Sequence, residues 1–111
     1  MAVLTVATVS RAGVDVVGVA ADSLGDEWPN SGLEFIEVFN GGGGSINVTL
    51  DIRPTLDGAA VVDPVIAIPA AGRRIIGPFP PGIYNDATGR AKVTYSGVAS
   101  VTIKALKCPP A

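Results

Sequence analysis

The sequence predicts an all-β protein, and three features of its composition support this class. Its apolar residues are mostly Val, Ile and Ala, and hydrophobic residues together make up 48% of the 111 positions. These residue types favour strands, while 14 Gly and 9 Pro supply turns between them. Short apolar stretches alternate with polar positions and are separated by turn residues. We therefore expect a single-domain antiparallel β-sandwich, jelly-roll-like, with about eight short strands.

One domain is expected over residues 1–111, because a chain of this size can bury one apolar core without cross-links. The charged fraction of 16% is too low for a disordered chain. Cys108 is the only cysteine, so no intrachain disulfide can form. No stretch reaches the ~20 apolar residues of a membrane span, and no basic residue precedes the first apolar run. We expect no membrane partner and no cleaved secretion signal.

The N-terminal part predicts two extended segments. Residues 3–9 are strongly β-prone, with Leu4 and Val6 on one face. After a turn, residues 14–20 form a short valine-rich run that favours a strand over a helix. Residues 1–10 could instead form an extended arm that orders on a neighbouring subunit.

Residues 22–32 predict the one long polar loop. It holds the only tryptophan, Trp28, and three acidic residues, Asp22, Asp26 and Glu27. Loop carboxylates suit Ca²⁺, but this spacing matches no known calcium loop, so we expect no metal site. Trp28 could be a contact anchor, since Trp is enriched at binding hot spots, or it could cover one end of the core.

A glycine-rich loop, Asn40–Gly44, separates two predicted strands at residues 33–39 and 45–53. A phosphate-binding loop would require a following helix, whereas the second strand alternates strictly, so we predict a hairpin. Its apolar face consists of Ile46, Val48, Leu50 and Ile52.

The C-terminal half predicts three further features. Prolines bracket a strand at residues 64–69, which places it at a sheet edge or limits it to short pairing. A strand over residues 73–79 must end at its prolines, which cannot donate ladder hydrogen bonds, and residues 84–89 form a loop or one helical turn. Residues 90–96 and 98–106 alternate around a tight turn and predict a closing hairpin.

The residue types exclude most catalytic chemistry. The chain has no His, which removes imidazole bases and the commonest metal ligand, and no Ser lies in a Gly-x-Ser-x-Gly setting. We therefore predict no enzyme activity, no catalytic residue and no cofactor. A net charge of −2 without a clustered basic face also predicts no nucleic-acid partner.

Five residues are the predicted contact residues for a protein partner. Three are aromatic residues in or beside loops, and two form the only adjacent basic pair: Trp28, Phe79, Tyr84, Arg73 and Arg74. Three rings are too few to claim a carbohydrate-stacking platform, and Phe79 beside prolines could instead fill the core.

The densest motif runs through Ile76-Gly77-Pro78-Phe79-Pro80 and Tyr84-Asn85-Asp86, then Gly89-Arg90 and Val93-Thr94-Tyr95-Ser96-Gly97-Val98. In these turns and strands the chain resembles a group of small tailed-phage and prophage virion proteins. The N-terminal half agrees more loosely, in Ser10–Gly13, Ala20–Asp22 and Asn40–Gly43.

This resemblance implies a capsid decoration (cement) protein that binds the major capsid protein and itself, as a homotrimer at local three-fold positions. It would be made in the host cytoplasm and would reside on the capsid surface of the virion. Two alternatives stay open. One is a glycan-binding or host-attachment module on the virion surface, and the other is a tail or head–tail joining component.

Overall fold

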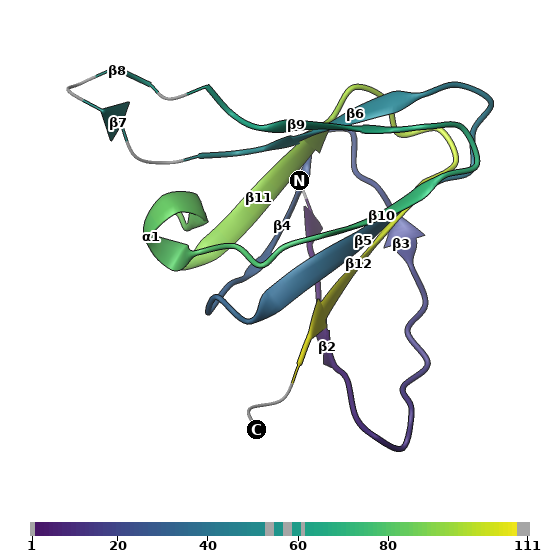
Figure 1. Cartoon of the computed structure of the whole chain (residues 1–111), viewed down its shortest axis with the longest axis horizontal. Helices are drawn as coiled ribbons and strands as arrows, with labels where there is room; N and C mark the ends of the chain where they lie inside the picture. The colour runs from purple at the N-terminus through teal and green to yellow at the C-terminus, as the bar shows by residue number, and fades with distance from the viewer. Residues whose placement is uncertain (1, 53–54, 57–58, 61, 109–111) are drawn as a thin grey trace.

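Two β-sheets packed against one another form the fold, which confirms the all-β sandwich (Figure 1). The computed structural model describes residues 2–52, 55–56, 59–60 and 62–108. Sheet A has, in order, β1 (Ala2–Val3), β4 (Asp26–Pro29), β11 (Arg90–Tyr95), β6 (Ile46–Leu50) and β9 (Val65–Ile68). Sheet B has β10 (Arg73–Ile76), β5 (Glu34–Asn40), β12 (Val101–Lys107) and β2 (Val6–Thr8), and β3 (Val19–Ala20) also pairs with β12.

Two small elements lie outside these sheets. A separate ladder joins β7 (Thr55–Leu56) to β8 (Ala59–Ala60), and Figure 1 shows it at the left, away from the two sheets. A single turn of helix, α1 (Pro81–Tyr84), begins with a proline whose fixed φ suits the first helical position. It precedes the predicted loop or helical turn at residues 84–89 and shares only Tyr84 with it, while residues 85–89 lie outside the helix.

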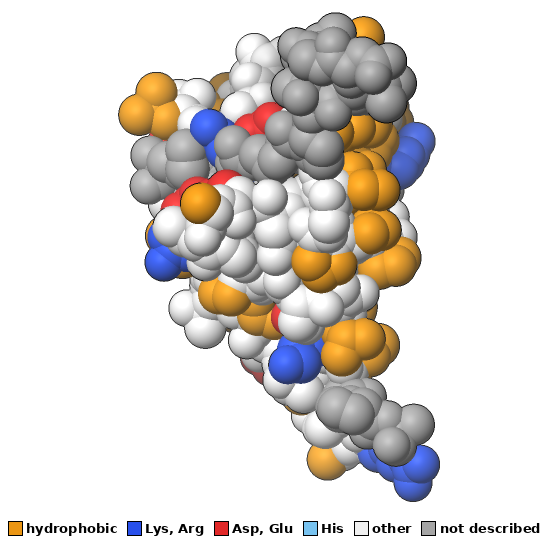
Figure 2. Space-filling model, turned by 90° about the vertical axis from the view of Figure 1, so that its left-hand side faces the viewer, with side chains coloured by type: hydrophobic (Ala, Val, Ile, Leu, Met, Phe, Trp, Pro, Cys, Tyr) orange, Lys and Arg blue, Asp and Glu red, His pale blue; other side chains and the backbone are white. Residues whose placement is uncertain are grey.

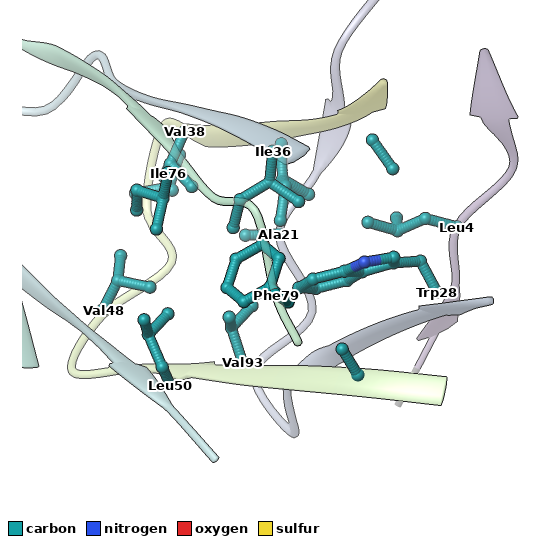
Figure 3. Packing of buried hydrophobic residues seen from close by; sticks show 14 of the residues in the cluster. Leu4, Ala21, Trp28, Ile36, Val38, Val48, Leu50, Ile76, Phe79 and Val93 are labelled. Carbon is teal, nitrogen blue, oxygen red and sulfur yellow. The ribbon is translucent and has the colours of Figure 1, made fainter. Parts of the chain in front are cut away.

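Strict alternation along the strands explains the core. In β5 every second residue, from Glu34 to Asn40, is buried, and the residues between them are half-buried. The same pattern holds in β12, which pairs with β5 along its whole length. The inward faces of both sheets meet in one cluster, seen from close by in Figure 3. Its fully buried large side chains are Trp28, Phe79, Ile36, Ile68, Ile103, Val38, Val48, Val93 and Val101.

Both predicted hairpins are wrong, because each crosses between the sheets. β5 belongs to sheet B and β6 to sheet A, while β11 belongs to sheet A and β12 to sheet B. Alternation fixes which face of a strand is buried but not which strand lies beside it. The first crossing is held by Asn40, whose buried amide donates to the carbonyl oxygens of Gly44 and Ile68 at 2.8 and 3.2 Å.

The predicted polar loop 22–32 contains a strand instead. β4 pairs with β11 on one side and with β1 on the other. The alternation of polar and apolar residues in β4 is hidden in the sequence, because one of its inward positions is a carboxylate. Asp26 is fully buried and accepts a 2.7 Å hydrogen bond from the Tyr95 hydroxyl. The next inward position of β4 is Trp28, which therefore lies in the core.

The N-terminal segment takes part in both sheets. It leaves β1 in sheet A, buries Leu4, and enters β2 in sheet B. Both of its pairings, β1 with β4 and β2 with β12, are parallel, so the two sheets are mixed and not purely antiparallel. Residues 2–8 therefore pair with their own chain, and residues 9–18, which include most of the second predicted run, lie outside the strands.

The predicted edge strand at 64–69 is observed as β9, at the end of sheet A. The strand predicted over 73–79 ends at Ile76, immediately before Gly77-Pro78. The strand predicted over 45–53 is observed as Ile46–Leu50, and residue 53 lies outside the described residues.

Gly77→Ala is expected to lower the free energy of unfolding by about 2–4 kcal/mol. Gly77 has φ +143°, and a Cβ there would lie 2.7 Å from Phe35 Cβ. Gly82→Ala in α1 is the matched control, since its Cβ would meet no atom within 4 Å. Urea unfolding measures both variants, and equal stabilities would show that the corner does not require glycine.

Candidate contact surface

The corner at residues 77–85 is fixed by a pair of asparagines. The Asn30 side-chain amide donates to the Phe79 carbonyl at 2.8 Å and to the Asn85 side-chain oxygen at 2.7 Å. In return, the Asn85 amide donates to the Asn30 carbonyl at 2.8 Å. These bonds satisfy buried polar groups in a segment whose prolines cannot donate, and they tie the corner to the end of β4.

Two of the predicted contact residues are buried, which corrects that prediction for them. Trp28 is 0% and Phe79 2% exposed, and their rings meet edge to face at 5.2 Å between centroids. Figure 3 places Phe79 in the middle of the cluster, with Trp28 beside it. Their burial instead agrees with the alternative predictions, in which Trp28 covers one end of the core and Phe79 fills the core. Burial of these large rings stabilises the domain more than exposure would.

The third aromatic, Tyr84, is half-buried, and its ring packs edge to face on Phe79 at 5.3 Å. It therefore supports the corner from outside and leaves part of its surface in solvent.

Arg73 and Arg74 are exposed, as a contact role requires, and lie on β10 at the end of sheet B. The Arg73 guanidinium lies 4.9 Å from the centre of the Phe39 ring and 3.2 Å from the Glu37 carboxylate. Lys104 reaches the same carboxylate oxygen at 3.5 Å. Each such exposed pair contributes about 0–1 kcal/mol. These ion pairs therefore add little to the stability of the fold.

A surface that the sequence analysis missed lies around residues 9–19. Four valines with exposed side chains, here called the N-terminal valine surface, are Val3, Val14, Val17 and Val19. A hollow of about 350 Å³ is lined by Val3, Val17 and Val19, together with β12. Two more hollows, of about 300 and 360 Å³, lie where the same segment borders sheet B near Glu37 and Lys104.

The sequence did contain a signal for this surface. Residues 14–20 hold four valines but also Asp15 and Gly18, and only Val19 and Ala20 pair as a strand. A strand over the whole run would place alternate side chains in the core, whereas the Val17 side chain is 80% exposed. A valine-rich segment that no sheet partner buries is available to another molecule.

The open edges of the sandwich carry further apolar side chains. β9 and β10 end the two sheets, and Val65 and Ile75 on them are exposed, as is Ile83 in α1. Figure 2 shows hydrophobic side chains gathered along one margin of the molecule. Pro64 and Pro69 bracket β9, which limits strand addition there. β10 contains no proline, so its edge is more accessible to an added strand than the edge of β9.

The acidic residues near β4 have structural partners. The Asp22 carboxylate accepts from the Leu24 amide at 2.9 Å, and this hydrogen bond is the main cause that lowers the pKa of Asp22. Burial and the hydrogen bond to Asp26 raise the pKa of Tyr95, which keeps its hydroxyl a donor. Among the described residues, no group of three or more His, Cys, Asp or Glu is arranged to hold a metal ion.

Comparison with known proteins gives no identification: no protein family, no curated protein and no solved structure matches the chain. In the described part of the chain, no helix has the length and apolar character needed to cross a membrane.

Asn30→Ala is expected to lower the free energy of unfolding by about 1–3 kcal/mol, because the buried Phe79 carbonyl loses its amide donor. Thermal unfolding measures this change. Asn47→Ala, at an exposed position of β6, is the control and should unfold like the parent chain. Unchanged stability of Asn30→Ala would mean that the asparagine pair does not hold the corner.

Glu34 should make stability depend on acid pH. Burial acts to raise its pKa, but hydrogen bonds from the Ser31 amide and hydroxyl and the Leu33 amide prevail and hold the pKa below its ordinary value of 4.5. A pKa that is depressed on folding gives stability that is present above pH 4.5 and is lost as pH falls through the folded-state pKa.

Glu34→Gln should therefore reduce the loss of unfolding free energy below pH 4.5, as urea unfolding across a pH series would measure. Asn47→Ala, at an exposed position of β6, serves as the control and should keep the parent slope. An identical acid slope for Glu34→Gln and the parent chain would exclude this role for Glu34.

Proposed function

We propose that the chain is a structural protein of a tailed-phage or prophage virion that binds the outer capsid surface and stabilises the head. The observation that carries the proposal is the N-terminal valine surface, an exposed apolar region beside hollows in an otherwise well-packed domain. Exposed apolar patches of this kind mark interaction sites. The resemblance to small virion proteins supplies the class of partner, the major capsid protein.

The shape of the molecule supports a docking role. The segment between β2 and β3 projects from the body in Figure 1. Its Val14 and Val17 side chains are exposed, and a partner could bury them.

A second copy is also an expected partner. In a homotrimer, weak contacts of each subunit with the capsid act together, so that the assembly binds far more tightly than one subunit. Gel filtration coupled to light scattering measures the mass, and a stable monomer at working concentration would count against the trimer.

The glycan-binding alternative has less support. Stacking on sugars needs accessible aromatic rings, but Trp28 and Phe79 are buried and Tyr84 packs on Phe79. The Phe39 ring is covered by the Arg73 guanidinium. Binding in a glycan array would favour this alternative over capsid docking.

Val17→Asp is expected to reduce co-sedimentation of the chain with heads that lack it at least about tenfold, because a charge would be buried in the contact. Val17 is 80% exposed, so the melting temperature should not change. Leu24→Asp is the matched control, since Leu24 is 69% exposed on a different loop. Equal capsid binding by both variants would place the contact elsewhere.

A further inference from the structure

We propose that the free edge of β10 binds an extended acidic peptide segment, which adds to sheet B as a further strand. β10 is the last strand of this sheet among the described residues. The site is distinct from the N-terminal valine surface, and the inference does not depend on the capsid role.

Two hydrogen bonds establish which backbone groups β10 presents. The Asn40 amide donates to the Gly72 carbonyl at 2.8 Å, and antiparallel pairing makes alternate residues face the neighbouring strand. Arg74 therefore directs its backbone groups toward β5, whereas Arg73 and Ile75 direct theirs away from the sheet. The Arg74 guanidinium donates to the Arg73 carbonyl at 2.9 Å, so this oxygen lies on the open side.

The side chains around this edge define the chemistry of the partner. Arg73 pairs with Phe39 and lies on the outer face of sheet B, where Glu37 contacts both Arg73 and Lys104. Arg74 pairs with the buried Val38 and therefore leaves β10 on the opposite face. The edge strand thus carries one exposed arginine on each face. An added strand with carboxylates opposite Arg73 and Arg74 would gain charge-assisted contacts.

The apolar part of the edge gives the third element of recognition. Ile75 is 66% exposed and lies two residues along β10 from Arg73, on the same face of the sheet. A β-branched residue opposite Ile75 would form an apolar cross-strand pair. Self-pairing of two β10 strands is disfavoured, because it would set arginines against arginines. The occupant that fits is thus an extended segment with adjacent acidic residues and one aliphatic neighbour.

The test is an NMR titration of the ¹⁵N-labelled full chain with the capped peptide Thr-Thr-Val-Glu-Glu-Thr-Thr. The expected result is shifts concentrated at the amides of Arg73 to Ile76, with slower solvent exchange of the Arg73 and Ile75 amide protons. The same peptide with Lys in place of both Glu should give no such response. Equal responses to both peptides, or shifts confined to other strands, would overturn the proposal.

Two variants separate backbone pairing from charge. Ile75→Pro removes an outward amide without removing a hydrogen bond to β5, so it should fold and lose the peptide. If it does not fold, Arg74→Glu decides, with an expected loss of affinity of about tenfold. Arg11→Glu is the matched control, an exposed arginine in the segment between β2 and β3, and should bind like the parent chain. Unchanged binding by a folded Ile75→Pro or by Arg74→Glu would contradict edge pairing.

Discussion

The contact between Phe79 and Trp28 is the interaction on which the rest of the sandwich depends. Trp28 comes from β4 in sheet A, and Phe79 comes from the corner that follows β10 in sheet B, so their edge-to-face packing joins the two layers. The asparagine pair then fixes the backbone on which Phe79 is carried. Because Phe79 is anchored in the core, the corner shapes the domain.

The sheet edges on the two sides of the molecule differ in how far they are covered. The N-terminal segment covers one side with β1, β2 and β3, and this short, partly parallel pairing leaves Val14, Val17 and Val19 exposed. On the other side β9 and β10 stay open, with prolines limiting access to β9 and arginines marking β10. Open edges invite strand pairing, so a protein that keeps them without aggregating needs either protection or a partner. The proposed capsid contact would cover the N-terminal side, and the proposed peptide would pair with β10 on the other side.

The fold class and most inward faces could be predicted from alternation alone, as in Ile46 to Leu50 and Val101 to Ala105. The sheet assignments could not, because the same alternation suits a hairpin and a crossing between sheets. β4 was missed because its inward positions include a carboxylate, and only the distant Tyr95 explains why Asp26 can be buried. Trp28 and Phe79 were predicted to be exposed for a related reason: aromatic residues in proline-rich loops suggested exposure, whereas these two rings fill the core between the sheets.

We propose that this domain binds a capsid through exposed apolar surface. Imaging purified particles by cryo-electron microscopy, with and without the chain, is the decisive test. Additional density is expected on the outer head surface, with residues 14–19 against the major capsid protein. Density only on the tail, or particles that are identical with and without the chain, would contradict it.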